Sequence, residues 1–364
     1  MEAKRNFIIA GGGTGGHVYP GVAIARAFKQ IDHKINVHFV GTVRGIEATI
    51  VAAEGYTLHV VSDGQLHSSV GLWKRLRTVL LMPLAIFQCL RLCLTLKPVG
   101  ILGVGGYASG PMLLVASCLG YRTAIWEPNA MPGMANRVLS RFVSRAYLVF
   151  ASAQKYLRCK DTRRAGMPVR FEFGEPSARP EKSEVFRVLI FGGSQGAAAL
   201  NRVVCQALLQ GGEWMRGVRF VHQTGSKDFL EVRNAYDAGA QSAFSSVEVM
   251  PYLNDMELRY RDADLVVCRG GASTLAELMA CGKPAVIVPL PTAADNHQQK
   301  NAEELVNAGA AQMILQKELT SEKLVDTLEY YKHHPEQLAQ MAARARKLHR
   351  PGAAEELARD LLSD

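Results

Sequence analysis

The chain has 364 residues, of which 48% are hydrophobic and 21% charged, and its formal net charge is +9. This length suggests two domains with buried cores, and the positive charge favours anionic partners. Nucleic acid is disfavoured as that partner, because the basic residues are dispersed and no RNA- or DNA-reading motif is present. The seven cysteines form no C-x-x-C pair and show no zinc spacing, and no signal peptide is predicted. These features predict a reducing, cytoplasmic compartment.

Apolar strand-like runs alternate with helical runs along the first half of the chain. Strands are expected at 6–10, 36–41, 57–61, 100–104, 123–127 and 145–150, with helices near 16–30 and 44–54. The alternation is typical of parallel βαβ units. Residues 98–121 carry no charge but hold six glycines and two prolines. We expect that stretch to fold as strand, loop and helix rather than to span a membrane.

The second half repeats the same architecture. A strand, glycine turn and helix are expected over 186–201, followed by strands at 219–225, 247–253, 263–271 and 284–290. The chain is therefore divided into a first domain (1–166), a linker (167–185) and a second domain (186–340), with C-terminal helices at 341–364 that can cross back to the first domain. The predicted fold is α/β, with two Rossmann-like doubly wound parallel-sheet domains facing across a cleft. Ligands are expected at the carboxyl ends of the strands.

The stretch "GGGTGGHVYP" follows the first predicted strand and begins a helix. Its glycines let a ligand approach the backbone closely, and the helix N-terminus favours an anion such as a phosphate. Gly11, Gly13 and Gly16 also satisfy the dinucleotide fingerprint, but the second strand ends without the carboxylate that would hold a ribose. An NAD-dependent dehydrogenase is therefore disfavoured. His17, in the first helical turn, suits a general base or an acceptor-orienting hydrogen bond; the alternative is a purely structural or binding role.

Three polar motifs mark the second half. "FGGSQG" places Ser194 at a strand-to-helix turn that suits a pyrophosphate. "RGGASTLAE" places Glu277 on a helix, where its carboxylate can accept two hydrogen bonds from a ribose diol or simply complement the helix N-terminus. "DNHQQKNAEEL" offers Gln298 and Gln299 for sugar hydroxyls, although an ordinary helix start would look similar.

Six motifs in order make the chain resemble a known family. They are "GGGTGGHVYP", "VGGYASGP", "WEPNAMPGMANR", "FGGSQGAAALN", "VVCRGGASTLAEL" and "DNHQQKNA". The chain resembles the bacterial N-acetylglucosamine (GlcNAc) transferases of peptidoglycan synthesis, glycosyltransferase family 28. The resemblance implies the glycosyltransferase B fold and an inverting, metal-independent transfer without a cofactor. GlcNAc would pass from UDP-GlcNAc to the 4-hydroxyl of N-acetylmuramic acid (MurNAc) in undecaprenyl-pyrophosphoryl-MurNAc-pentapeptide (lipid I), giving lipid II and UDP.

The resemblance also implies site residues. Leu253 would contact uracil through its backbone, Glu277 would bind the ribose, and Arg170 would neutralise the diphosphate unless it is a solvated linker residue. The implied substrate-binding set is Thr14, Gly15, Gly16, Asn129, Arg170, Ser194, Leu253, Ala272, Ser273, Thr274, Leu275, Ala276, Glu277, Gln298 and Gln299. No metal ligand is implied.

The catalytic candidates are His17 and Glu127. Glu127 is the rival base, and its alternative is a buried strand-end carboxylate paired with a backbone N–H. The family pattern His-Glu-Gln-Asn reads Trp126-Glu127-Pro128-Asn129 here, which weakens the case for a chemical role of the two flanking positions.

Residues 71–98 mix basic and bulky apolar side chains at helical spacing: Leu72, Trp73, Leu76, Val79 and Leu80 with Lys74, Arg75, Arg77 and Arg91. Such a helix suits the anionic inner leaflet of the cytoplasmic membrane, and the alternative is an ordinary helix packed on the sheet. We expect a peripheral membrane protein on the cytoplasmic side. Two other functions stay open: a UDP-sugar epimerase of similar fold, and a non-enzymatic lipid-surface or interaction protein.

Overall fold

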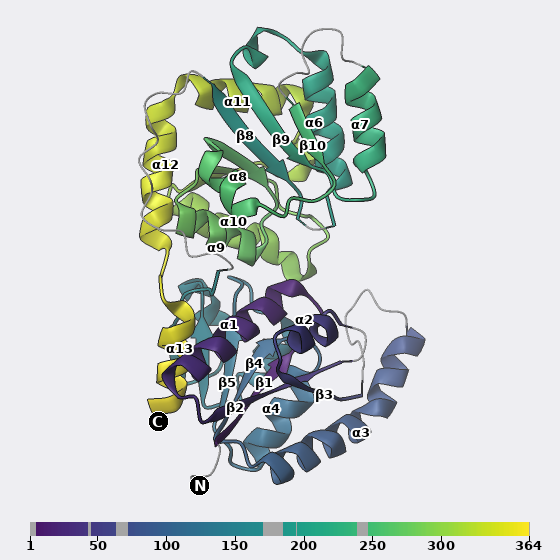
Figure 1. Cartoon of the computed structure of the whole chain (residues 1–364), viewed down its shortest axis with the longest axis vertical. Helices are drawn as coiled ribbons and strands as arrows, with labels where there is room; N and C mark the ends of the chain where they lie inside the picture. The colour runs from purple at the N-terminus through teal and green to yellow at the C-terminus, as the bar shows by residue number, and fades with distance from the viewer. Residues whose placement is uncertain are drawn as a thin grey trace. The chain divides into compact units, whose positions relative to one another are not determined.

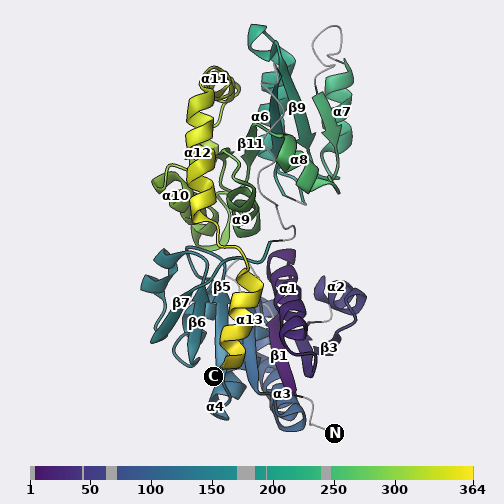
Figure 2. The ribbon, with the colours of Figure 1, turned by 60° about the vertical axis from the view of Figure 1, so that its left-hand side comes forward.

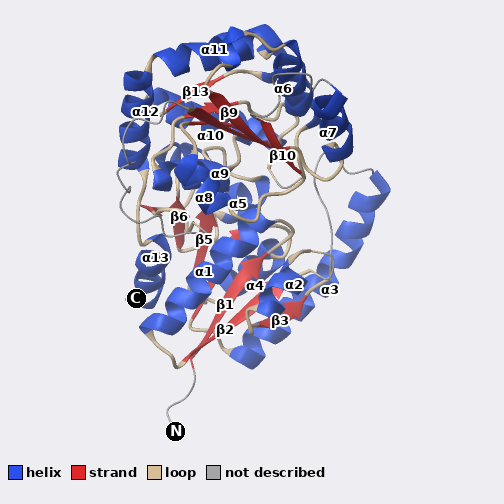
Figure 3. Cartoon of the chain, turned by 45° about the horizontal axis from the view of Figure 1, so that its top comes forward, coloured by secondary structure: helices blue, strands red, loops and turns tan. Residues whose placement is uncertain are grey.

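The computed structural model describes residues 5–42, 45–62, 72–169, 185–193, 195–238 and 247–363. The chain divides into two compact units, one formed by residues 1–168 with 350–364 and the other by residues 169–349. In each unit helices lie on both faces of a single sheet (Figure 3). This is the doubly wound α/β architecture that the alternating sequence pattern predicts.

The first unit has a seven-stranded parallel sheet in the order β3-β2-β1-β4-β5-β6-β7. Its strands are β1 (Arg5–Gly11), β2 (Ile35–Gly41), β3 (Thr57–Val60), β4 (Gly100–Gly105), β5 (Thr123–Glu127), β6 (Arg145–Leu148) and β7 (Asp161–Arg164). Its α-helices are α1 (Gly15–Ile31), α2 (Glu47–Ala53), α3 (Leu72–Leu96), α4 (Ser109–Cys118), α5 (Met134–Leu139) and α13 (Ala353–Ser363). Strands β4 and β5 are buried along their whole length, as expected for a sheet covered on both faces.

The second unit has a six-stranded parallel sheet in the order β10-β9-β8-β11-β12-β13. Its strands are β8 (Phe186–Phe191), β9 (Val218–Gln223), β10 (Val247–Met250), β11 (Leu265–Cys268), β12 (Ala285–Ile287) and β13 (Ala311–Met313). Its α-helices are α6 (Ala198–Gln210), α7 (Phe229–Ala238), α8 (Met256–Asp262), α9 (Ala272–Cys281), α10 (His297–Asn307), α11 (Ser321–His333) and α12 (Pro335–Leu348). Figure 1 labels the helices and strands of both units.

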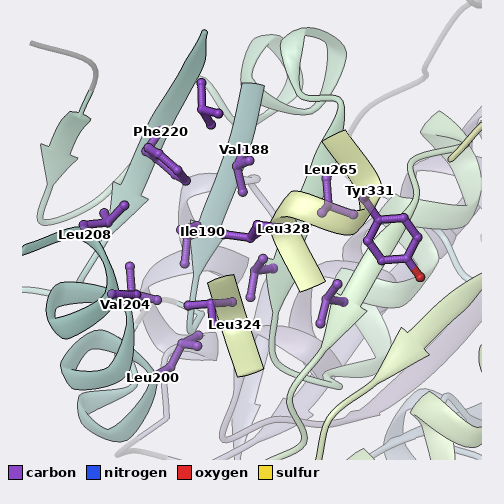
Figure 4. Close-up of a cluster of buried hydrophobic side chains, with 14 of the residues drawn as sticks. Val188, Ile190, Leu200, Val204, Leu208, Phe220, Leu265, Leu324, Leu328 and Tyr331 are labelled. Atoms are coloured by element: carbon purple, nitrogen blue, oxygen red, sulfur yellow. The ribbon is translucent and has the colours of Figure 1, made fainter. Parts of the chain in front are cut away.

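The core of the second unit lies between its sheet and helices α6 and α11 (Figure 4). Alternate residues of β8, Val188 and Ile190, point to this side, where they pack among the apolar faces of both helices. Burying each such side chain stabilises the fold by about 1.5–3 kcal/mol. The rigid layers hold the strand ends, and therefore the loops that follow them, in fixed places.

The C-terminal helix α13 belongs to the first unit and lies beside α1 (Figures 1 and 2). Asp360 fixes it to the sheet, because its carboxylate accepts hydrogen bonds from Arg145 (3.0 Å), the Tyr147 hydroxyl (2.5 Å) and Arg163. Within the predicted C-terminal segment 341–364, the residues from 350 onward are those that join the first unit.

Residues 98–121 form strand β4, a turn and helix α4, as expected from their glycines. Among the described residues, no helix combines the length and apolar character that crossing a membrane requires. All seven cysteines lie in the described part of the chain, and each is a free thiol there.

Candidate active site

The candidate residues collect at one edge of each sheet. In the first unit the strand order reverses between β1 and β4, and in the second between β8 and β11. Such switch points leave a crevice outside the carboxyl ends of the strands, where α/β proteins bind ligands. The two glycine-rich motifs follow β1 and β8, so each one stands at the switch point of its own sheet.

In the first unit, Thr14 is the N-cap of α1, and Gly15, Gly16 and His17 form its first turn. The amides of Gly15 and Gly16 have no earlier turn to bond to, so they and the helix dipole face the strand ends. The imidazole of His17 lies against Gly105 at the end of β4: a Cβ on Gly105 would come within 2.6 Å of His17 Nδ1. Gly105 also has a φ of +102°, which favours glycine.

A buried carboxylate that was not predicted from the sequence also bonds to the loop between β1 and α1. Glu47, at the start of α2, is buried, and its carboxylate accepts hydrogen bonds from the Gly13 amide (2.8 Å) and the Thr42 amide (3.0 Å). The Gly12 amide donates to the Gly105 carbonyl (3.2 Å). Two of the loop amides are therefore already occupied, and those at the start of α1 are the ones placed for a ligand.

Glu127, at the end of β5, is fully surrounded by hydrogen-bond donors. Its two oxygens accept from the amide and side chain of Asn129 (2.9 and 3.1 Å), the Gly133 amide (3.1 Å) and the side chain of Asn136 (2.8 Å). Burial raises the pKa of Glu127 despite these bonds. The contacts are those of a buried strand-end carboxylate, and they fix the position of Asn129 and of the loop that leads to α5.

In the second unit, Ser194 lies outside the described residues, but its neighbour Gly193 is held by a hydrogen bond from Gln223. This buried side chain, at the end of β9, donates to the Gly193 carbonyl (3.0 Å) and accepts from the Leu253 amide (3.0 Å). Gln223 therefore connects the glycine turn to the predicted uracil contact. The sequence signal was a pair of polar residues, His222 and Gln223, at the end of the strand.

The segment from Ala272 to Glu277 forms the first half of α9. Ala272, Ser273 and Thr274 are partly accessible in its first turn, whereas the side chains of Leu275 and Ala276 are buried in the core. Those two residues can contact a ligand only through their backbone.

Glu277 lies beyond the first turn of α9, so its carboxylate does not complement the helix N-terminus. Instead it is buried and accepts a hydrogen bond from the hydroxyl of Tyr260 (2.9 Å), whose side chain is completely buried. Burial, with the nearby Glu277 charge, raises the pKa of Tyr260 far above its usual range. The tyrosine therefore stays a hydrogen-bond donor and orients the carboxylate.

Gln298 and Gln299 begin α10, and both make internal contacts. Gln298 Oε1 accepts from the Leu290 amide (3.0 Å), and Gln299 donates to Glu303 (3.0 Å). The turn after β11 also contacts the first turn of α10, because a Cβ on Gly270 would overlap the Gln298 carbonyl. The start of α10, which carries the predicted sugar residues, is thereby held against the turn that leads into α9.

A buried arginine in the turn after β11 was also not predicted from the sequence. Arg269, at the start of the "RGG" turn, donates to the Val288 carbonyl (3.0 Å), the Pro289 carbonyl (3.3 Å) and Gln316 (2.8 Å). Burial lowers its pKa. Its bonds to these three acceptors connect the end of β11 to the end of β12. This connection is made by the tertiary fold, so the local sequence pattern does not indicate it.

Arg170, predicted to neutralise the diphosphate, lies outside the described residues. No group of three or more His, Cys, Asp or Glu side chains in the described ranges is arranged to hold a metal ion.

Comparison with known proteins then identifies the family. Residues 7–148 match the glycosyltransferase family 28 N-terminal domain, and residues 187–357 match the C-terminal domain of that family. The chain belongs to glycosyltransferase family 28. It has the glycosyltransferase B fold that its motifs imply, and it is a sugar transferase.

Similar proteins match this chain over its whole length or nearly so. The chain is 46% identical over 362 residues to UDP-N-acetylglucosamine–N-acetylmuramyl-(pentapeptide) pyrophosphoryl-undecaprenol N-acetylglucosamine transferase of Bdellovibrio bacteriovorus, covering 100% of both chains. Among solved structures, MurG of Acinetobacter baumannii matches with a TM-score of 0.80 and 28% identity over 99% of this chain and 100% of that one.

A UDP-GlcNAc 2-epimerase from Neisseria meningitidis, bound to UDP-GlcNAc, matches with a TM-score of 0.68 over 99% of this chain and 100% of that one. Its identity is only 11%, so it shares the fold alone.

Proposed function

We propose that this protein transfers GlcNAc from UDP-GlcNAc to the MurNAc 4-hydroxyl of lipid I, releasing UDP and lipid II. The observation that carries the proposal is the full-length family match, 46% identical to a transferase named for this reaction. The geometry supports it, because each sheet presents polar groups at its switch point. The acceptor is assigned to the first unit and the nucleotide donor to the second.

In this proposal the second unit binds the donor, UDP-GlcNAc. Glu277, oriented by Tyr260, is suited to accept hydrogen bonds from both ribose hydroxyls. The free first-turn amides of α9, with the turn around Ser194 and with Arg170, would receive the diphosphate. Leu253 would meet the uracil, and Gln298 and Gln299 would meet the sugar.

The reaction is a displacement at the sugar C1. The MurNAc oxygen forms a bond to C1 while the bond from C1 to the diphosphate oxygen breaks, which inverts the configuration and leaves UDP with the electron pair. The hydroxyl proton passes to His17, whose position in the first turn of α1 favours a neutral imidazole. Such base assistance contributes about 10²–10⁴-fold, and stabilisation of the leaving diphosphate contributes more.

Glu127 has a different role in this proposal. With four donors on its two oxygens, it is better suited to orient Asn129 than to collect a proton. His17 is therefore the preferred base and Glu127 a positioning residue.

The test is a product assay with UDP-GlcNAc labelled in the sugar. With a soluble lipid I analogue, label should enter the acceptor and UDP should appear in equal amount. With UDP-GlcNAc alone the donor should stay unchanged. Conversion of the donor to another UDP-sugar would favour the epimerase, and no binding of UDP by calorimetry would favour a non-enzymatic protein.

We also propose peripheral contact with the anionic inner leaflet through α3. Leu80, Leu84, Phe87 and Leu94 are 71%, 47%, 62% and 57% exposed, and with the exposed Arg91 they recur at helical spacing on one stripe. Exposed apolar side chains grouped in this way are typical of interaction surfaces. The predicted basic residues Lys74, Arg75 and Arg77, with the side chains of Leu72, Trp73, Leu76 and Val79, lie outside what the structure describes.

A further inference from the structure

The buried carboxylate of Glu47 is enclosed by the first glycine-rich loop and the end of β2. One oxygen accepts from the Gly13 amide (2.8 Å), and the other accepts from both the amide (3.0 Å) and the hydroxyl (2.9 Å) of Thr42. The side chain is 1% exposed. Thirty-four residues separate Glu47 from Gly13, so this contact is made by the tertiary fold.

Three glycines lie so close to this carboxylate that none of them could carry a side chain without meeting it. A Cβ added at Gly12 or Gly45 would overlap the carboxylate atoms, and one at Gly41 would come within 2.8 Å of Glu47 Cγ. Gly12 in the loop after β1, Gly41 at the end of β2 and Gly45 just before α2 therefore form a cradle around one side chain. Their lack of a side chain serves an internal carboxylate rather than an incoming ligand.

The charge of Glu47 is retained in this cradle. Burial alone would raise its pKa, but the hydrogen bonds from Gly13 and Thr42 outweigh burial, and the pKa is lowered. A carboxylate that stays ionised is a strong acceptor for backbone amides. It also places a negative charge beneath the loop that leads into α1.

This arrangement differs from that of a dinucleotide site, although the glycines match the fingerprint. In a dinucleotide-binding fold the loop amides face the pyrophosphate, and an acidic residue at the end of the second strand binds the ribose. Here the acidic residue comes from α2 and bonds to the loop itself. The Gly13 amide is thereby withdrawn from any ligand.

We propose that Glu47 is a positioning residue that holds the first glycine-rich loop so that only the amides at the start of α1 face the acceptor. The inference rests on the proposed function, in which this edge receives the lipid-linked acceptor. Glu47 fixes the direction of the chain from Gly13 into Thr14, and therefore the place of His17 one turn later. It acts through the loop and does not touch the substrates.

Glu47→Gln tests this role, because the amide replaces one acceptor oxygen with a donor that faces backbone N–H groups. The matched control is Glu54→Gln at the C-terminal end of α2, where the carboxylate pairs with Arg26 on the surface. Loss of bonds to a charged acceptor should lower kcat/KM for the acceptor by about 10- to 100-fold. The KM for UDP-GlcNAc and the Kd of UDP, which depend on the second unit, should change less than about twofold. The control should match the wild type.

Hydrogen exchange measures the protection of the loop amides directly and requires no acceptor substrate. Amides in residues 11–17 should exchange faster in Glu47→Gln than in the wild type or Glu54→Gln. Equal exchange in all three proteins would overturn the inference, as would an equal loss of donor and acceptor efficiency, which indicates general damage. If the wild-type protein itself fails to transfer GlcNAc, the proposed function fails, and the exchange result still decides the role of Glu47.

Discussion

Acid should destabilise the second unit through one buried histidine. His222, on β9, is completely buried, with Nδ1 3.0 Å from the Tyr236 hydroxyl and Nε2 3.1 Å from Asn201 Oδ1. The side-chain amide of Asn201 donates to the Thr224 carbonyl and to Asp228, so its oxygen must accept from His222. The neutral imidazole therefore carries its proton on Nε2 and accepts from Tyr236 on Nδ1.

Burial lowers the pKa of His222 from 6.5 to about 4. At roughly 1.4 kcal/mol per pKa unit, this corresponds to about 3 kcal/mol. The unfolded chain binds the proton near pH 6.5 and the folded chain only near pH 4, so the free energy of unfolding should fall as the pH drops through that range. Asn201 lies in the first turn of α6, the helix that follows the second glycine-rich motif in the chain, so the donor site should be disturbed as well.

The assay compares urea unfolding of the wild type and His222→Gln between pH 7 and pH 4. Glutamine keeps a donor for Asn201 but does not titrate, so the difference between the two proteins isolates His222 from every other group. We expect the wild type to lose about 3 kcal/mol more than the variant across this range. A difference that stays constant with pH would refute the reasoning.

Three further predictions concern the site. Gly105→Ala should push the imidazole of His17 aside and lower kcat by about 100-fold, with the Kd of UDP unchanged in calorimetry. Tyr260→Phe removes the donor that orients Glu277, so UDP should bind about 10-fold more weakly, while an analogue without ribose hydroxyls should be affected little. Phe87→Asp on α3 should reduce sedimentation with anionic vesicles several-fold, with turnover of a soluble acceptor retained.

Each of these has a result that would contradict it. Full turnover by Gly105→Ala would mean that His17 does not act as the base. Equal weakening of UDP and the ribose-free analogue by Tyr260→Phe would mean that the tyrosine only supports the core. For the membrane prediction the control is Leu209→Asp, an exposed leucine on α6 in the second unit, and equal loss by both variants would point to a general effect of charge.

The sequence predicted the elements and the switch-point loops because those features are local. Apolar runs that end in glycine mark a buried strand and its turn, so the places of His17 and Glu277 followed from the pattern. The short edge strands β7 and β13 were missed, because "DTRR" and "AQM" lack an apolar run.

The residues that support the site were missed for another reason. Glu47, Gln223 and Tyr260 bond to partners 34, 30 and 17 residues away, and two of those partners are backbone amides that carry no sequence signal. Whether a polar side chain folds back onto a loop depends on how neighbouring strands align. Periodicity within one segment does not contain that information.

The most direct test of the central claim is a crystal structure of the protein with UDP. The account predicts the nucleotide at the carboxyl edge of the second sheet, with both ribose hydroxyls within hydrogen-bonding distance of Glu277. UDP bound instead to the loop between Gly11 and His17 would contradict it, because that loop is assigned to the acceptor.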